Sequence, residues 1–490
     1  MKKLFFALSI FTIVVGLALP AAAVDIPDEV TLIKNVNIFD GVNEKLLEGY
    51  DVLVVKNLIK KIDKNIKLAS NYEIDVKTGG YKEMAGGVLS DLPGHGNQAV
   101  TVYEPEKMIK KEVKVRVIDG KGRTLIPGLI DVHWHMNYAA VPASILLTGD
   151  MSEVAIIGFL QAEKTLMRGF TSVRDMGGNP FAIKKLTDTG KYPGPRIFAS
   201  GPPISQTSGH YDYGLKNDHP QNLTDPISYW ERNSVIMTAD GVPEVILRVR
   251  ENLRMGATQI KIAAGAGVAS SYDDLDVQEF LFEEIKAAVD VAKTWNTYVA
   301  AHTFTDEAIQ TAIKAGVKSI EHGNLMSEKT LKMMKKNDVW LSAQPIFNDG
   351  DYATFEDPYL QEKFNKVTAG TDRVYKNAKK IGVKIAFGTD LAFDPAAPAK
   401  QGKMLAKLGR YFTPYEALKM ATSTNAELLK LCGPRNPYRE GDLGVIKEGA
   451  YADMVLVDGN PLDNLDLVVD PDKNFVVIMK DGKIYKNTIK

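Results

Sequence analysis

The sequence contains a single cysteine, Cys432, which excludes a disulfide framework and a cysteine-rich zinc site within the chain. Its charges nearly cancel, because 60 Lys and Arg residues stand against 61 Asp and Glu residues. Without a basic excess, the chain lacks the electrostatic means to displace counterions from a nucleic acid, and we expect no such partner. The Gly-x-Ser-x-Gly motif is also missing, which argues against a serine hydrolase of the nucleophile-elbow type.

Histidine is scarce as well, so a histidine-based site must draw on a short set. The seven histidines of the chain are His95, His133, His135, His210, His219, His302 and His322. The remaining composition is typical of a folded globular protein, since 45% of the 490 residues are apolar and 25% are charged. This length predicts one large domain with an appendage, or several modules.

Residues 1–23 have the pattern of a secretory signal peptide. Lys2 and Lys3 precede an apolar run from Leu4 to Leu19, and three alanines then fit the small-residue pattern at a cleavage site. An N-terminal membrane anchor is the alternative, but the run is short for a bilayer span of about 20 residues. The sequence therefore predicts an exported protein, periplasmic or secreted, with no stable membrane insertion after cleavage.

Both ends of the mature chain are rich in β-type runs. In residues 24–126, alternating apolar and polar residues with turn residues between the runs are typical of an antiparallel sheet. Residues 441–490 hold only two or three further runs, too few for an independent unit. We therefore expect both segments to form one discontinuous β-sandwich domain. Residues 76–110, rich in glycine and polar side chains, predict an insertion or long hairpin with His95 in a surface loop.

The central segment, residues 127–440, alternates short buried-type strands with amphipathic helical stretches. The eight expected strands are 129–133, 171–175, 196–200, 259–263, 298–302, 318–322, 339–343 and 383–387. Eight strands that alternate with helices are typical of a (β/α)8 TIM-like barrel, whose active site lies at the carboxyl ends of the strands. An open doubly wound α/β sheet is the alternative.

The first of these strands ends in Asp131-Val-His-Trp-His. Residues two apart on a strand face the same side, so His133 and His135 would project together at the barrel mouth. Two imidazoles so placed suit one borderline metal ion, although a His-x-His sequence also arises by chance. The position at a predicted strand end favours the metal.

Three more strand ends supply groups of the same kind. His302 ends the fifth strand, His322 ends the sixth, and Asp390 follows the eighth. Each of them alone is more commonly a buried, hydrogen-bonded structural residue. Their joint position on one rim of the barrel indicates a metal site instead.

Lys261 lies within the fourth strand, where a buried charge is costly unless it is paired or chemically altered. Carboxylation by carbon dioxide would turn its ammonium into a carbamate with two oxygen donors, and such a group can bridge two metal ions. Neutralisation by a nearby carboxylate is the alternative that the sequence leaves open.

These motifs, in this order along the chain, resemble the amidohydrolase superfamily. The resemblance is carried by Pro127-Gly-Leu-Ile-Asp-Val-His-Trp-His, Lys261, His302, His322, Asp390 and the C-terminal run Gly444-Val-Ile-Lys-Glu-Gly-Ala-Tyr-Ala-Asp-Met-Val-Leu-Val-Asp. Within the superfamily, the sequence is most similar to the imidazolonepropionase-like group that includes the Xaa-Pro dipeptidases, or prolidases. The resemblance covers nearly all of the mature chain.

The resemblance implies a centre of two divalent metal ions, with zinc as the first expectation. The implied ligands are His133 and His135 for the first ion, His302 and His322 for the second, and carboxylated Lys261 as the bridge between them. Asp390 would contact the first ion and shuttle a proton during catalysis.

The run Gln206-Thr-Ser-Gly-His resembles a Gly-His motif that contributes to the substrate pocket of this group. His210 would stabilise a developing oxyanion or hold a substrate carboxylate, with a plain loop role as the alternative. Its neighbour Tyr211 lies in the same long loop, residues 201–240, and long loops on this rim usually shape substrate choice. Phe304 departs from the group, whose members often have a tyrosine there; if that tyrosine hydrogen-bonds the substrate, this protein must use another donor, which argues against an Xaa-Pro specificity.

The resulting prediction is an enzyme that hydrolyses an amide bond of a small molecule, such as a dipeptide or an N-acyl amino acid. A hydroxide shared by the two metals would attack the carbonyl, and Asp390 would pass its proton to the leaving nitrogen. The alternatives are a cyclic-amide hydrolase or deaminase, a lactone or ester hydrolase on the same scaffold, and a non-catalytic exported binding protein. The oligomeric state stays open, homo-oligomers included.

Overall fold

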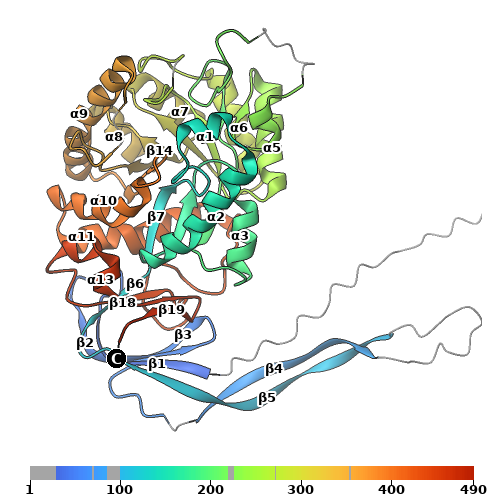
Figure 1. Ribbon diagram of the computed structural model, residues 1–490, viewed down its shortest axis with the longest axis vertical. Coiled ribbons are helices and arrows are strands. Elements are labelled where there is room, and N and C mark those ends of the chain that lie inside the picture. The colour runs from blue at the N-terminus through green and yellow to red at the C-terminus, as the bar shows by residue number, and fades with distance from the viewer. Residues whose placement is uncertain are drawn as a thin grey trace, which may run out of the picture. The chain divides into compact units, whose positions relative to one another are not determined.

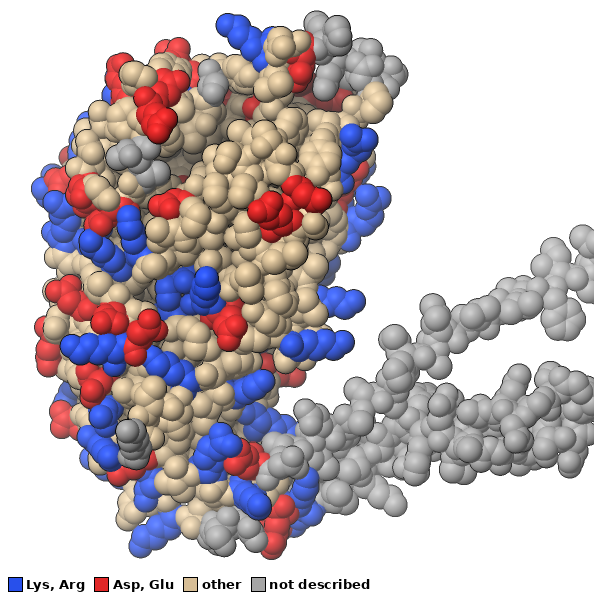
Figure 2. Space-filling view, viewed as in Figure 1, with Lys and Arg blue, Asp and Glu red and all other residues tan. Residues whose placement is uncertain are grey.

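The computed structural model of the chain describes residues 29–68, 71–84, 100–218, 226–270, 272–352 and 355–489. The expected signal peptide, His95 and His219 lie outside these residues, and the signal peptide stays a prediction. Acidic and basic side chains are interspersed over the face of the molecule drawn in Figure 2. This face therefore carries no extended area of one charge sign.

The chain divides into two compact units, which are Met1–Val30 with Lys67–Arg116 and Thr31–Ile66 with Val117–Lys490. Within the smaller unit, the long strands β4 (Asn71–Met84) and β5 (Val100–Asp119) pair as an antiparallel hairpin (Figure 1). This hairpin coincides with the segment for which the sequence predicts an insertion or long hairpin.

In the larger unit, the N-terminal and C-terminal segments share one sheet (Figure 1). Its strands are β1 (Glu29–Ile38), β2 (Leu47–Val55), β3 (Leu58–Asp63), β6 (Thr124–Pro127), β17 (Met454–Val457), β18 (Phe475–Lys480) and β19 (Lys483–Asn487). Their order is β19-β18-β17-β6-β1-β2-β3, so β6 pairs with β1 on one side and with β17 on the other. Ile38, Val54 and Leu456 belong to its apolar core. The pairing of strands from both chain ends in one sheet is as expected. The second layer of the expected β-sandwich and the domain boundaries stay predictions.

Strands lie at all eight positions where the sequence predicts them in the central segment. They are β7 (Leu129–Trp134), β8 (Phe170–Asp175), β9 (Arg196–Ala199), β12 (Ile260–Ala263), β13 (Val299–Thr303), β14 (Ser319–His322), β15 (Trp340–Ala343) and β16 (Ile385–Phe387). Hydrogen bonds join them into two parallel ladders, β7-β8-β9 and β12-β13-β14-β15-β16. The second ladder also includes two short strands that the sequence did not predict, β10 (Ile204–Ser205) and β11 (Met237–Thr238).

Backbone hydrogen bonds lie where the two ladders would meet. Beside β9 and β12, the N–H of Thr258 donates to the carbonyl oxygen of Ala199 over 2.8 Å. At the ends of β16 and β7, the N–H of Asp390 donates to the carbonyl oxygen of His133 over 2.8 Å. These contacts are of the kind that a closed barrel requires, and closure itself stays a prediction.

Helices surround the parallel strands (Figure 1). They are α1 (Ala143–Thr148), α2 (Met151–Met167), α3 (Phe181–Asp188), α4 (Tyr229–Arg232), α5 (Val242–Met255), α6 (Phe282–Thr294), α7 (Asp306–Ala315), α8 (Glu328–Lys336), α9 (Pro358–Ile381), α10 (Gln401–Lys407), α11 (Pro414–Lys419), α12 (Asn425–Leu429) and α13 (Pro471–Asn474). The longest, α9, begins where the Asp357 carboxylate accepts a hydrogen bond from the N–H of Tyr359, and ends at Gly382 in the left-handed conformation. In the described part of the chain, no helix is both long and apolar enough to span a membrane.

The connection between the sheet and the parallel strands fixes the direction of those strands. Only Gly128 separates β6 of the sheet from β7, and its N–H donates to the carbonyl oxygen of Asp453, just before β17. The parallel strands therefore begin beside the sheet and end on the opposite side, where side chains at their carboxyl ends gather.

Candidate metal centre and active site

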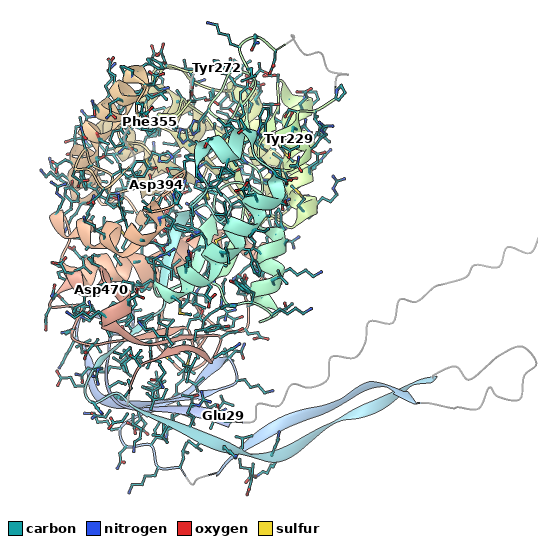
Figure 3. All side chains as sticks on the ribbon, viewed as in Figure 1. Glu29, Tyr229, Tyr272, Phe355, Asp394 and Asp470 are labelled. Atoms are coloured by element: carbon teal, nitrogen blue, oxygen red, sulfur yellow. The ribbon has the colours of Figure 1, made fainter. Side chains whose placement is uncertain are left out.

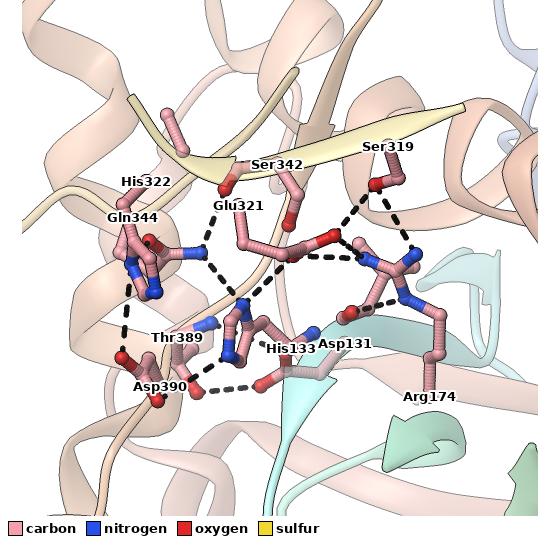
Figure 4. Close-up of polar contacts among 12 residues, drawn as sticks. Asp131, His133, Arg174, Ser319, Glu321, His322, Ser342, Gln344, Thr389 and Asp390 are labelled. Carbon is pink, nitrogen blue, oxygen red and sulfur yellow. Dashed lines mark hydrogen bonds and ion pairs between the residues drawn. The ribbon is translucent and has the colours of Figure 1, made fainter. Parts of the chain in front are cut away.

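Three of the predicted ligands surround the carboxylate of a fourth, Asp390, at the carboxyl ends of the strands. His133 on β7, His322 at the end of β14 and Asp390 after β16 each place a donor atom within 4.8 Å of the others (Figure 4). Nε2 of His133 is 3.5 Å from Oδ1 of Asp390, and Nδ1 of His322 is 3.8 Å from Oδ2. His135 faces the same carboxylate, with its Nε2 3.1 Å from Oδ1.

The other two predicted ligands lie on the neighbouring strands β13 and β12. The ring of His302 is 4.5 Å from that of His322, and its Nε2 is 3.0 Å from the carbonyl oxygen of Ala266. Lys261 is fully buried, and its Nζ has no hydrogen-bond partner among the described residues. A carboxylate that neutralises this amine by direct contact is therefore not found in the described part of the chain.

Two of the ligand candidates have unusual backbone conformations. His322 has φ of 71° and Asp390 has φ of 54°, values that non-glycine residues rarely adopt. Such strain persists only where the surrounding structure holds it, and it is common at functional sites. Gly388 permits the close approach that positions Asp390, because a Cβ at residue 388 would lie 2.5 Å from the Cβ of His133.

A buried ion pair between Arg174 and Glu321 orients the imidazole of His133 (Figure 4). Nδ1 of His133 is 2.8 Å from Oε2 of Glu321, and Arg174 donates to Oε1 of the same carboxylate over 2.8 Å. Burial would raise the pKa of Glu321, but Arg174 and His133 together hold it well below its usual range. A carboxylate that accepts from Nδ1 leaves Nε2 free to face a metal, which is the usual arrangement behind a metal-bound histidine.

This pair was not among the residues predicted from the sequence, although the sequence contains a signal for it. Arg174 and Glu321 are charges within buried strands, and the argument applied to Lys261 applies equally to them. Their opposite signs predict a pair across the barrel. Gln344, directly after β15, was missed as well, and its amide contacts Nδ1 of both His322 and His133, at 2.7 Å and 3.2 Å.

Electrostatics at the site favour neutral imidazoles and an ionised aspartate. Burial and then the charge of Lys261 lower the pKa of His133 to about 3, and burial lowers that of His322 to about 4. Neutral imidazoles keep the lone pair that a metal requires. Burial alone would raise the pKa of Asp390, but the neighbouring histidines, His133 first, hold it below its usual range. Burial lowers the pKa of Lys261 to about 8, so part of its amine is uncharged near neutral pH.

A cavity of about 330 Å³ opens onto this group. It is in the size range of small-molecule sites, roughly 300–1,000 Å³. The three residues assigned to substrate binding from the sequence, His210, Tyr211 and Phe304, all line it. The ring of His210 stacks on that of His302 at a centroid distance of 4.0 Å, and Phe304 meets the same ring edge-on at 5.1 Å.

A residue outside the predicted set, Glu279, holds the loop of His210. Its carboxyl group accepts from the N–H of His210 over 2.7 Å and from the hydroxyl of Ser205 over 2.8 Å. The loop after β12 packs against the same imidazole, and a Cβ at residue 267 would lie 1.7 Å from its Nδ1, so Gly267 is required there. Glu279 follows no predicted strand, which is why the strand-end rule did not find it.

The residues of this cluster fit a divalent metal ion. Imidazole and carboxylate donors suit zinc and similar ions. In the described part of the chain, buried polar atoms without partners include Nζ of Lys261 and Nδ1 of His135. A carbamate on the lysine would give its buried end oxygen donors in place of an unpaired amine.

Polar side chains at the carboxyl ends of parallel strands, facing one cavity, define the class of α/β enzymes whose active site lies at that end of the strands. Residues 124–490 match the model of the amidohydrolase family, and the chain belongs to this family. This confirms the resemblance that the sequence motifs carry. The protein is accordingly a hydrolase that acts on carbon–nitrogen bonds.

Individual relatives support the same assignment. The chain is 33% identical over 380 residues to ochratoxinase of Aspergillus niger, covering 74% of this chain and 75% of that protein. It is similar to a solved amidohydrolase structure, with a TM-score of 0.78 and 30% identity over 94% of this chain and 100% of the other. A prolidase complexed with N-methylphosphonate-L-proline gives a TM-score of 0.77 and 30% identity, with the same coverage of both chains.

Proposed function

We propose that this protein hydrolyses an amide bond of a small molecule with the help of two divalent metal ions. The observation that carries the proposal is the cluster of His133, His322 and Asp390, whose donor atoms lie within 4.8 Å of one another at the cavity floor. The solved relatives include a prolidase, and a curated relative is an ochratoxinase, which supports amide chemistry.

The candidate ligands divide between two ions as the family resemblance implies. His133 and His135 would hold one ion and His302 and His322 the other, with Asp390 also on the first and a carboxylated Lys261 supplying oxygen donors. Ions bound there would polarise the substrate carbonyl and lower the pKa of a coordinated water. The unpaired, fully buried Lys261 supports two ions rather than the single ion of a deaminase-like site.

Asp390 is the group placed to move the proton. It is ionised at neutral pH because the neighbouring histidines hold its pKa low, and its Oδ1 lies 3.1 Å from Nε2 of His135. It would accept the proton of the attacking water and pass it to the amide nitrogen as the carbon–nitrogen bond breaks. The products are then a carboxylic acid and an amine, and Asp390 is again ionised.

His210 and Tyr211 would contact the substrate carbonyl. Burial lowers the pKa of His210 well below its usual value, so its ring is neutral. With its proton on Nε2, the ring would donate to a developing oxyanion, while Nδ1 lies 3.3 Å from the hydroxyl oxygen of Ser270. The phenol of Tyr211 lines the same cavity. It would act as the hydrogen-bond donor here, because Phe304 stands where related proteins often have a tyrosine.

The test is amide hydrolysis by the purified, zinc-loaded chain and its loss on metal removal. Across a panel of N-acyl anilides, N-acyl amino acids and dipeptides, at least one member should release its amine. A chelator should lower that rate by at least about a hundredfold, and added zinc should restore it. Amide hydrolysis that survives complete metal removal, or activity confined to lactones and esters, would contradict the proposal.

A further inference from the structure

The walls of the cavity carry almost no charge. Among the described residues that line it, Asp390 is the one carboxylate, and neither lysine nor arginine is present. Apart from histidines and tyrosines, the other described lining residues have no ionisable side chain. Away from the candidate metal ligands, no described lining residue therefore carries a fixed positive charge that could pair with an anionic substituent.

Two helices supply apolar walls on either side. α1 contributes Leu146 and Leu147, and α9 contributes Leu360, Phe364 and Val367. These segments are more than two hundred positions apart in the sequence, and they face one cavity because each covers the carboxyl ends of different strands. The walls bury hydrocarbon surface when an apolar group enters, which favours binding by roughly 25 cal/mol per Å².

Aromatic rings form much of the remaining lining. Tyr352 stacks on Phe364 with ring centroids 5.9 Å apart, and Tyr138 stacks on Phe393 at 6.0 Å. The Tyr352 hydroxyl donates to the carbonyl oxygen of Asp390, and the Tyr138 hydroxyl donates to that of Val235, just before β11. Because both hydroxyls are engaged, these rings present hydrocarbon to the cavity. The ring of Phe355 also lines the cavity. In Figure 3 it lies in the part of the larger unit far from Asp470.

One buried cation on α9 already has hydrogen-bond partners. Lys363 lies on α9 beside the lining residue Phe364, and its Nζ donates to the carbonyl oxygens of Ser270 and Asp273 over 3.0 Å and 2.7 Å. The Asp273 carboxylate is 3.7 Å from the same ammonium. Lys363 does not line the cavity, so a substrate carboxylate would enter without a partner.

We infer that the cavity takes an uncharged amide with aromatic groups on both sides of the bond, and disfavours substrates with a free carboxylate on the leaving amine. The inference rests on the proposed function and narrows it, because free dipeptides and N-acyl amino acids would then be poor substrates. The physical reason is that a buried carboxylate loses its hydration and gains no counter-charge. Aromatic groups instead gain contact with the stacked rings of the lining.

A matched pair of compounds tests the inference. N-(4-acetylphenyl)benzamide and 4-(benzoylamino)benzoate share the amide and both rings, and differ at the para position, where an uncharged acetyl group replaces an ionised carboxylate. With the zinc-loaded chain, kcat/KM should be at least about 30-fold higher for the acetyl compound. Equal values, or a preference for the carboxylate, would overturn the inference and leave amide hydrolysis standing.

Binding gives a second readout that does not depend on turnover. Calorimetry of both compounds, on the zinc-loaded chain and on the chelator-treated chain, should show tighter binding of the acetyl compound in each. If neither compound is cleaved, the proposed function is in question, while the order of affinities still decides the inference. Tighter binding of the carboxylate to the chelator-treated chain would overturn it.

A designed cation sharpens the comparison. Leu360→Arg places a guanidinium on the cavity wall of α9 and should shift the ratio of kcat/KM values at least about tenfold toward the carboxylate. Ala369→Arg adds the same charge to the same helix at an exposed position outside the cavity, and it should leave the ratio unchanged. An equal shift of the kcat/KM ratio in both variants would mean that the effect of the added charge does not depend on its position in the cavity.

Discussion

Replacing Asp390 with asparagine is expected to lower turnover by at least about a hundredfold while much of the metal stays bound. A positioned general base contributes about 10²–10⁴-fold to rate, and an asparagine amide cannot accept a proton at neutral pH. The amide keeps the size of the side chain and one oxygen donor. The carboxylate faces both His133 and His135, at 3.5 Å and 3.1 Å, so the substitution acts at the centre of the site.

The control for this variant is Asp394→Asn. Asp394 lies four residues further along, caps the N–H of Ala396 over 2.8 Å and does not line the cavity, so near-normal turnover is expected. Metal content, melting temperature and turnover should be measured on the same samples. An Asp390→Asn protein that is less stable but turns over within a few-fold of the parent would assign Asp390 a structural role only.

Replacing Lys261 with alanine is expected to remove metal and activity together. The side chain is fully buried with no hydrogen-bond partner for its Nζ, which is explained if a carbamate at this position holds the two ions. A short carboxylic acid supplied in the buffer would occupy the vacated space and restore part of the metal and part of the rate. Metal analysis with and without the acid measures both effects.

Two further variants separate ligation from packing. Lys261→Met keeps the volume of the aliphatic stem, so it should lose the metal without the loss of stability that a cavity causes. Lys480→Ala removes another buried lysine, on β18 of the sheet, and should leave the metal content unchanged. Full metal content and full activity in Lys261→Ala would show that the lysine is structural.

Strand positions and strand-end residues were predictable because both rest on local sequence. The eight strands follow from short apolar runs between helical periods, and the carboxyl ends of parallel strands meet on one side. His133, His322 and Asp390 therefore come together as expected, although they lie on strands far apart in the sequence. Pairing of β6 with β17 was predictable for a different reason, since isolated terminal strands need a partner.

The supporting contacts were not predictable in the same way. Glu279 holds His210 from a loop without a periodic pattern, and only the fold brings the two together. The short strands β10 and β11 are two residues each, below the length at which alternation is detectable. The walls of the cavity depend on how α1 and α9 pack, and sequence periodicity gives the buried face of a helix but not its neighbour.

The most direct test of the account is a metal titration of the chelator-treated chain. Zinc is added in known equivalents, bound metal is measured by mass spectrometry, and hydrolysis of one accepted amide is followed in the same samples. The rate should reach its maximum at about two bound ions per chain, as in two-metal hydrolytic sites. A rate that is already maximal at one bound ion, or in the absence of metal, would contradict it.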